Sequence, residues 1–381
     1  MSLALYLHFP FCFNKCSYCD FYKELYSKEL EQKFFDALKT ETELASDQLK
    51  KSYHSIKLSS IFIGGGTPSV ATLERLEDWL NLLREKFEVP KGIEFSFECN
   101  PESITQEKLE RLQELGITRP TYGVQTFDKK LLKILDRKHN PHDTQQAVYM
   151  TNALRFKQFG LDLIFGIPKQ TSKILKEDLD QLLNLNPPHI SYYQLTLEEG
   201  TRLKNRVDAG EFQMEPQEMM ASLFRIGCEK FKEAGYTHYE VSSFAKPGSE
   251  CHHNIAYWQG DDYLGLGPAA HSFIDGERFF NPSSLVEYKM ALDQKQLPRT
   301  IDLSGIEERM VETIMLGLRT MWGISKNKFR HKFETELEDQ LDQPAFEKLL
   351  NSGHLLDDGS ALKLSEEGLY LADEIIARLV K

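Results

Sequence analysis

Three cysteines lie close together near the start of the chain, in the segment Cys12-Phe13-Asn14-Lys15-Cys16-Ser17-Tyr18-Cys19. Thiolates at this spacing can converge on one inorganic centre, and three of them favour a metal cluster that keeps one site open. Two alternatives compete: a zinc knuckle with His8 as the fourth ligand, and cysteines that bind nothing. Zinc sites usually pair two CxxC units that are far apart in sequence, and no second unit is present. The spacing therefore predicts an open cluster that can bind a reactive small molecule.

Further candidate groups stand at the ends of apolar runs or within them. These are the Gly64-Gly65-Gly66-Thr67-Pro68 loop, Glu98, Gln125 and Asp162. Adjacent glycines let a backbone approach a ligand closely, although a plain tight turn needs the same residues. The alternative interpretation of Glu98 is an ordinary exposed carboxylate at the end of a strand. Asp162 needs a partner if it is buried, and a structural salt bridge with Arg137 is its alternative.

The apolar runs around these groups predict a parallel sheet. Six strand candidates alternate with helical patterns: 3–9, 60–63, 93–98, 121–124, 161–165 and 189–195. Helices are expected over 28–45, 73–83 and 109–115, the last with Thr105 as N-cap. Repeated strand and helix units favour an α/β fold with an incomplete (β/α)6 TIM-like barrel, and an open doubly wound sheet is the alternative. In both folds the chemistry belongs at the C-terminal ends of the strands.

The pattern changes near residue 300, which predicts a domain over 1–300 and a smaller one over 301–381. Helices are expected over 306–318 and 346–350, then a hairpin over 354–364 and one final helix over 366–380. This mixture is typical of a winged-helix-like module. The basic residues Lys326, Lys328, Arg330 and Lys332 could read DNA, but a solvated helix face in a lid or interaction module is the favoured interpretation.

Bulk composition excludes several classes of protein. The 381 residues carry a formal net charge of −12, which disfavours nonspecific binding to nucleic acid or to an anionic membrane. Six cysteines are too few for a disulfide scaffold in a chain of this size, and they indicate a reducing compartment. The N-terminal apolar run is too short for a signal peptide, and no stretch is long enough to span a membrane. A cytoplasmic protein is expected.

The CxxxCxxC spacing, with an aromatic residue before the last cysteine, resembles the signature of the radical S-adenosylmethionine (SAM) enzymes. The resemblance implies that Cys12, Cys16 and Cys19 hold a 4Fe-4S cluster whose fourth iron binds SAM, and that the fold is a partial barrel. An electron from the cluster would then cleave SAM to methionine and a 5'-deoxyadenosyl radical. Tyr18 would flank the adenine, and Gly65, Gly66 and Thr67 would bind the amino end of SAM.

Longer motifs narrow the resemblance to the oxygen-independent coproporphyrinogen III oxidase family. They include Tyr6-Leu7-His8-Phe9-Pro10-Phe11-Cys12, Gly123-Val124-Gln125-Thr126-Phe127 and Tyr239-Glu240-Val241-Ser242-Ser243-Phe244. By this resemblance the SAM-contacting positions are Tyr6, Gly65, Gly66, Thr67, Glu98, Gln125, Arg137 and Asp162. The coproporphyrinogen-oxidising members carry a fourth cysteine two residues after the third, where this chain has Phe21, and a longer N-terminal region.

The segment His253-Asn254-Ile255-Ala256-Tyr257-Trp258 resembles the HNxxYW mark of the haem chaperone branch of this family. An imidazole next to aromatic rings suits haem, so His253 is the candidate axial ligand, with Asn254, Tyr257 and Trp258 beside it. The segment belongs to an expected cap region around 239–280. The alternative to a haem site is a packed loop in which Tyr257 and Trp258 close the open side of the barrel.

The resemblance implies a haem chaperone that binds a 4Fe-4S cluster, SAM and haem and passes haem to haem-requiring respiratory proteins. An electron donor such as flavodoxin or ferredoxin is expected, and a homodimer is possible on the same grounds. The alternative is a coproporphyrinogen III dehydrogenase of porphyrin biosynthesis that decarboxylates propionates. A radical SAM methyltransferase with another substrate is a third reading.

Overall fold

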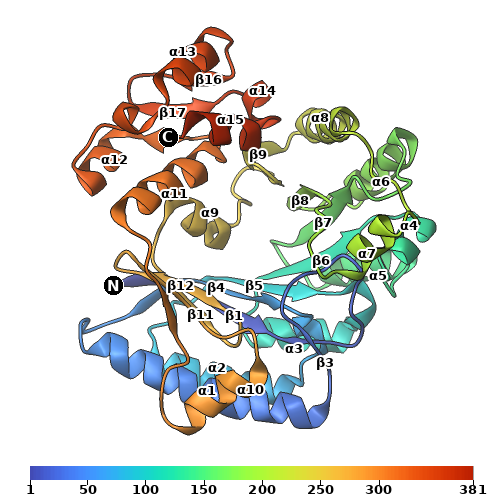
Figure 1. Ribbon diagram of the computed structural model, residues 1–381. Coiled ribbons are helices and arrows are strands. Elements are labelled where there is room, and N and C mark those ends of the chain that lie inside the picture. Colours follow the sequence, from blue (N-terminus) through green and yellow to red (C-terminus); the bar gives the residue numbers. More distant parts are fainter. Residues whose placement is uncertain (381) are drawn as a thin grey trace.

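Six consecutive parallel strands form the centre of the computed structural model, which describes residues 1–380 (Figure 1). They are β1 (Ser2–Phe9), β4 (Lys57–Gly65), β5 (Glu94–Cys99), β6 (Arg119–Gln125), β7 (Gly160–Phe165) and β8 (His189–Gln194). Their order in the sheet is their order along the chain. A doubly wound sheet would reverse strand order at a switch point, so the predicted partial barrel is confirmed and the doubly wound alternative is wrong.

Short strands that the sequence analysis missed extend both sides of this sheet. Next to β1, β11 (Tyr263–Leu266) is parallel, followed by antiparallel β12 (His271–Ile274), β13 (Glu277–Phe280) and β14 (Thr300–Asp302). Beyond β8 lie antiparallel β10 (Ser243–Ala245) and β9 (Thr237–Glu240). Strands of three or four residues are too short to show a period in sequence. The sheet ends at β14 and β9, which do not pair with each other, so the barrel is incomplete.

The outer helical layer comes from the connections between the parallel strands and from later helices that follow β8 and β13. The helices are α1 (Lys28–Lys50), α2 (Leu73–Lys86), α3 (Gln106–Glu114), α4 (Lys129–Ile134), α5 (Pro141–Ala153), α6 (Ser172–Asn184), α7 (Arg202–Asp208), α8 (Gln217–Glu233) and α10 (Leu285–Asp293). The three helices expected after the first three strands are confirmed as α1, α2 and α3. The N-cap of α3 is Thr105 as predicted, and its hydroxyl accepts a hydrogen bond from the Lys108 N–H at 3.2 Å.

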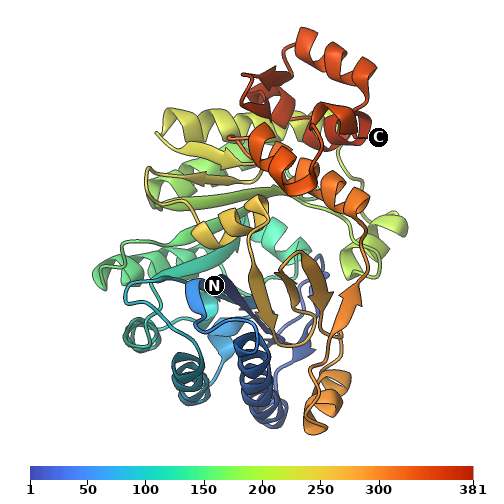
Figure 2. The same cartoon turned by 90° about the vertical axis from the view of Figure 1, so that its left-hand side faces the viewer.

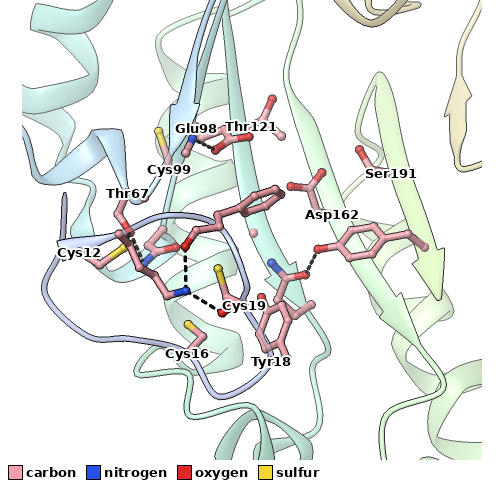
Figure 3. Close-up of a pocket in the computed structure, with 18 of the residues that line it drawn as sticks. Cys12, Cys16, Tyr18, Cys19, Thr67, Glu98, Cys99, Thr121, Asp162 and Ser191 are labelled. Atoms are coloured by element: carbon pink, nitrogen blue, oxygen red, sulfur yellow. Dashed lines mark hydrogen bonds between the residues drawn. The ribbon is translucent and has the colours of Figure 1, made fainter. Parts of the chain in front are cut away.

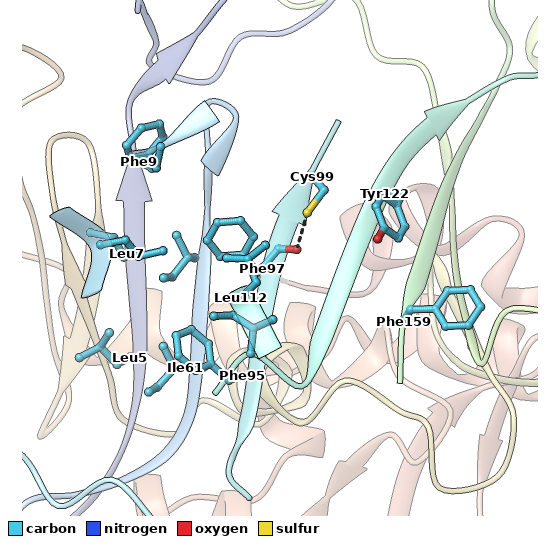
Figure 4. Close-up of a cluster of buried hydrophobic side chains, with 14 of the residues drawn as sticks. Leu5, Leu7, Phe9, Ile61, Phe95, Phe97, Cys99, Leu112, Tyr122 and Phe159 are labelled. Atoms are coloured by element: carbon cyan, nitrogen blue, oxygen red, sulfur yellow. Dashed lines mark hydrogen bonds between the residues drawn. The ribbon is translucent and has the colours of Figure 1, made fainter. Parts of the chain in front are cut away.

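Alternation along the strands separates the core from the barrel interior. On β1 and β5, Leu5, Leu7, Phe95 and Phe97 are buried against the helical layer, where Leu112 of α3 meets them (Figure 4). Each such side chain contributes roughly 1.5–3 kcal/mol when it is fully buried. Successive residues of a strand point to opposite faces, so the neighbours of these apolar residues face the barrel interior. Glu98, next to Phe97, is one of them.

The last fifth of the chain builds a separate apolar cluster. Its elements are α11 (Ile306–Leu318), β15 (Ile324–Ser325), α12 (Lys326–Phe333), α13 (Gln343–Asn351), β16 (Leu355–Asp357), β17 (Ala361–Leu364), α14 (Glu366–Leu369) and α15 (Ala372–Leu379). The expected first helix and hairpin are confirmed. The single final helix is wrong, because Leu371 leaves the helical region at φ −118° and the Tyr370 ring packs on Phe224 of α8.

This C-terminal module lies above the barrel in Figure 2. It contacts α8 through charged side chains. Arg225 pairs with Glu367 at 3.0 Å and Lys232 with Glu366 at 2.8 Å. The basic face of α12 is partly neutralised within the module: Lys326 pairs with Glu338 and Asp357, and Arg330 with Glu336. Within residues 1–380, no helix combines the length and the apolar character needed to cross a membrane.

Candidate functional site

A cavity of about 520 Å³ fills the barrel interior (Figure 3). At one end lies the cysteine loop, whose strand β2 (Phe11–Cys12) pairs with β3 (Glu24–Leu25). The walls come from β4 to β8. Of the residues predicted as cluster or SAM ligands, the cavity is lined by Cys12, Cys16, Tyr18, Cys19, Gly65, Gly66, Thr67, Glu98, Gln125, Arg137 and Asp162. The sheet therefore brings together groups that are up to 150 residues apart (from Cys12 to Asp162) in the chain.

The three thiols of the loop face this cavity, and polar donors surround them. The Thr67 hydroxyl donates to Cys12 Sγ at 3.3 Å, and Arg137 Nη1 donates to Cys16 Sγ at 3.7 Å. Burial raises the pKa of Cys12 to about 11 and also raises the pKa of Cys19. Thiols next to hydrogen-bond donors are suited to become thiolates when they bind a positively charged metal centre. The donor set therefore fits a cluster held by three sulfurs.

His8 does not face the cysteine loop as a fourth ligand would. Its Nε2 lies 2.8 Å from the Tyr22 carbonyl oxygen and its Nδ1 lies 3.2 Å from the Tyr6 hydroxyl. Across residues 1–380, no three His, Cys, Asp or Glu side chains are arranged to hold a single metal ion. The engagement of both His8 nitrogens argues against the zinc knuckle in which His8 is the fourth ligand. Tyr6 itself is turned toward His8 and does not line the cavity.

The glycine loop after β4 is pressed against the cysteine loop. The N–H of Gly66 donates to the Phe9 carbonyl at 2.7 Å, and that of Thr67 donates to the Phe11 carbonyl at 2.8 Å. Gly65 has φ +104°, and a Cβ there would lie 2.7 Å from the His8 ring. A Cβ on Gly66 would lie 2.7 Å from the Phe11 carbonyl oxygen. At both positions a side chain would clash with β1 or with the cysteine loop, so only glycine fits at this edge of the cavity. A plain surface turn would not have this requirement.

Glu98 and Asp162 are two of the carboxyl groups that line the cavity, and neither has a cationic partner in contact. Burial raises the pKa of Glu98 to about 8, and the charge of Asp162 adds a smaller effect in the same direction. A hydrogen bond from the Gly65 N–H at 3.2 Å opposes this shift. Burial raises the pKa of Asp162 to about 6, although a hydrogen bond from Ser191 opposes the shift. Such perturbed acids in a cavity suit a cationic ligand, whose charge would favour their ionised forms.

Arg137 does not form the salt bridge with Asp162 that was the structural alternative. Its Nη2 donates to the Gly123 carbonyl at 2.6 Å and to Asn100 Oδ1 at 2.9 Å, while Nη1 faces Cys16. The guanidinium therefore ties the cysteine loop to the ends of β5 and β6. Asn100 was missed as a site residue, although it stands in the Glu98-Cys99-Asn100-Pro101 segment that drew attention to Glu98.

Gln125 has an unusual backbone conformation at the end of β6. Its φ is +66°, and the pairing of β6 with β7 shifts register between Gly123 and Gln125. Its side-chain oxygen accepts a hydrogen bond from the Tyr193 hydroxyl at 2.9 Å. Tyr193, on β8, also lines the cavity and was not predicted. No local pattern distinguishes this tyrosine from its buried neighbour Tyr192.

The HNxxYW segment forms helix α9 (His252–Gln259), which packs at the opposite end of the cavity from the cysteine loop. Glu94, the first residue of β5, accepts the backbone N–H of His253 at 2.8 Å and of His252 at 3.0 Å. Arg119, the first residue of β6, donates to the Ser249 carbonyl at 2.7 Å. These contacts seat α9 on the N-terminal ends of the strands, so Asn254 lines the cavity floor.

His253 is fully buried inside this floor. Its Nδ1 lies 2.8 Å from the Ser60 hydroxyl and its Nε2 lies 2.7 Å from the Tyr257 hydroxyl. Burial lowers the pKa of His253 to about 3, so the ring is neutral. The Tyr257 ring packs on Tyr263 with centroids 4.5 Å apart, and Trp258 is half-buried. Both imidazole nitrogens are therefore hydrogen-bonded to hydroxyl groups of the protein. This arrangement is the one expected if the segment is packed and does not bind haem.

A partial barrel with three thiols at its mouth, beside a glycine loop, defines a radical SAM protein. The profile described as "Radical SAM superfamily" matches residues 6–182, and that described as "HemN C-terminal domain" matches residues 307–371. The fold is similar to that of the solved coproporphyrinogen III oxidase (HemN) of Escherichia coli, a radical SAM enzyme, with TM-score 0.85, 22% identity and coverage of 98% of this chain and 89% of that one.

Curated relatives extend over nearly the whole chain. The haem chaperone HemW of Bacillus subtilis is 34% identical over 98% of this chain and 97% of its own length. The haem chaperone HemW of Lactococcus lactis is 32% identical over 99% of this chain and 97% of its own length. This chain therefore belongs to the haem chaperone branch of the oxygen-independent coproporphyrinogen III oxidase-like radical SAM family.

Proposed function

We propose that this protein is a haem chaperone, which binds haem on a radical SAM scaffold and passes it to haem-requiring respiratory proteins in the cytoplasm. The observation that carries the proposal is the similarity, over almost the entire length, to relatives that are haem chaperones. The residue two positions after Cys19 is Phe21 and not a cysteine, which separates the chain from the coproporphyrinogen-oxidising members described above.

The cluster and SAM sites follow from the cavity. Cys12, Cys16 and Cys19 would hold a 4Fe-4S cluster, and the backbone of Gly65, Gly66 and Thr67 would bind the amino end of SAM. When bound, the cluster supplies an electron that can cleave SAM. Glu98 and Asp162 would balance the positive charge of this ligand, Tyr18 would flank its adenine, and Gln125 and Arg137 would orient it. Tyr6 would act through His8, because it does not reach the cavity surface.

Haem binding through His253 requires a local opening of α9. The imidazole is neutral, as an iron ligand must be, but Nε2 is bonded to Tyr257 and Nδ1 to Ser60. Haem would therefore displace the Tyr257 hydroxyl from Nε2, with Asn254 and Trp258 moving on the same helix. A flavodoxin or ferredoxin would reduce the cluster at the cysteine loop.

The test compares haem uptake with porphyrinogen turnover. Anaerobically reconstituted protein is titrated with haem, then incubated with coproporphyrinogen III, SAM and a reductant. A shifted Soret band without decarboxylated product supports the chaperone. Decarboxylation with little haem uptake would establish the alternative, a coproporphyrinogen III dehydrogenase.

The role of His253 is tested with a matched neighbour. His253→Ala should weaken haem binding at least tenfold, whereas His252→Ala, which removes an exposed imidazole from the same helix, should leave it unchanged. Equal affinities for the two variants would exclude His253 as the iron ligand. Thermal unfolding of both variants shows whether the loss reflects the site or the fold.

A further inference from the structure

A second, smaller crevice lies on the side of α9 that faces the C-terminal module. It measures about 100 Å³ and is lined by Tyr257 of α9, Tyr263 of β11, Arg278 of β13, Arg309 and Glu312 of α11, and Lys332 of α12. Strands and helices from the barrel and from the module thus contribute to one small site. Three cationic side chains and one carboxylate face it.

Of the three cations that line this crevice, only Arg278 forms an ion pair within residues 1–380. Arg278 forms an ion pair with Glu312, the single carboxylate that lines the crevice. The buried Nε of Arg278 has no hydrogen-bond partner among the described residues. Arg309 donates to the backbone carbonyls of Gly276 at 3.2 Å and Gly305 at 3.4 Å. Carbonyl oxygens do not cancel its charge.

Lys332 completes the set as an unpaired ammonium. Within residues 1–380, no carboxylate oxygen is paired with its Nζ, which lies 5.9 Å from the centre of the Phe273 ring. The carboxylates that act on its charge are Glu312, which is already paired with Arg278, and Asp261 and Asp262, and none of these three forms an ion pair with it. Among the described residues, Arg309 and Lys332 are therefore two cations without an ion pair next to a paired arginine, an arrangement that can accept an anion.

The size of the crevice limits what it can hold. A volume of about 100 Å³ corresponds to roughly three water molecules, so a carboxylate group fits but a macrocycle does not. Tyr257 links the crevice to the candidate haem ligand, because it lines the crevice and its hydroxyl holds His253 Nε2 at 2.7 Å. An anion bound here would lie one side chain away from His253.

We propose that this crevice binds a propionate carboxylate of haem, with Lys332 and Arg309 as the main anchors and Arg278 beside them. The inference rests on the proposed haem chaperone function and adds to it the residues that recognise the acidic edge of the ligand. A propionate held next to Tyr257 places the macrocycle against α9. It also gives the Tyr257 hydroxyl an alternative partner, which would release His253 Nε2 for iron.

The experiment uses haem and its dimethyl ester, in which both propionates are uncharged, as probes of the full-length protein. Soret titrations are performed with the wild type, Lys332→Gln, Arg309→Gln and the control Arg330→Gln. Arg330 lies on the same helix as Lys332 but is exposed and pairs with Glu336 at 2.6 Å. The wild type should bind haem at least tenfold more tightly than the diester.

Lys332→Gln and Arg309→Gln should each weaken haem binding about tenfold and leave diester binding unchanged, while Arg330→Gln changes neither. Two variants from different helices guard against a folding defect in one of them. Equal wild-type affinities for haem and the diester, or an unchanged haem affinity in both variants, would overturn the propionate site alone. A wild type that binds neither probe would overturn the chaperone function together with this site.

Discussion

Replacement of the buried carboxyl of Glu98 by an amide tests the electrostatics of the cavity directly. In the folded chain the pKa of Glu98 is about 8, against an ordinary value of 4.5, because burial disfavours its charge and Asp162 lies nearby. Between these two values the folded state keeps a proton that the unfolded state has lost. Folding stability from this group is therefore present below pH 4.5 and decreases as the pH rises toward 8.

The size of the effect follows from the shift. Each pKa unit corresponds to about 1.4 kcal/mol, so the carboxyl lowers the free energy of unfolding by up to about 5 kcal/mol at pH 8 relative to pH 4.5. Water that enters the cavity of the cofactor-free protein makes this figure an upper limit. Glu98→Gln cannot ionise, and its side-chain oxygen can still accept the Gly65 N–H.

Urea unfolding of the cofactor-free protein at pH 5 and pH 8 measures the difference. Glu98→Gln should gain stability relative to the wild type by several kcal/mol as the pH rises, and it should be the more stable protein at pH 8. Glu110→Gln, an exposed position on α3, should follow the wild type at both pH values. If Glu98→Gln and the wild type show parallel pH dependence, Glu98 is not the buried acid described here.

Three further outcomes follow from the same site. Cys16→Ala should abolish the cluster absorbance and the acid-labile sulfide of anaerobically reconstituted protein, whereas the buried Cys228→Ala should keep both; sulfide retained in Cys16→Ala would refute the ligand assignment. Gly65→Ala should lower the unfolding free energy by about 1–3 kcal/mol and weaken SAM binding at least tenfold. Gly92 also has positive φ but open space around it, so Gly92→Ala should leave SAM binding unchanged. Equal SAM affinities of Gly65→Ala and Gly92→Ala would contradict the close approach at Gly65. SAM binding at pH 7 should release close to one proton from Glu98, measured by calorimetry in buffers of different ionisation enthalpy, and Glu98→Gln should abolish the release; an equal release from the variant would exclude this carboxyl as the source.

Local sequence patterns were sufficient for the central strands and for the cysteine loop. Alternating apolar residues mark β1 and β5, because a strand that packs on helices must bury every second side chain. The three thiols lie within one short segment, from Cys12 to Cys19, so their convergence needs no long-range contact. The strands β9 to β14 were missed because each has only three or four residues and gains its stability from the neighbouring strand.

The partners of single side chains depended on tertiary structure. Arg137 was considered as a partner for Asp162, but the ends of β5 and β6 supply a carbonyl and an amide oxygen closer to its guanidinium. The final helix breaks at Leu371 because Tyr370 finds an aromatic partner on α8, far away in the chain. Neither contact leaves a periodic trace in the sequence.

The sequence by itself determined which residues can do chemistry, and that three sulfurs and a glycine loop follow consecutive strands. Only the tertiary structure decided that Glu98 and Asp162 share one cavity without a cation in contact, and that His253 is held between Ser60 and Tyr257 at its floor. The physical reason is that strand pairing and helix seating join residues far apart in the chain. The energies of these contacts depend on burial and distance, which a local pattern does not encode.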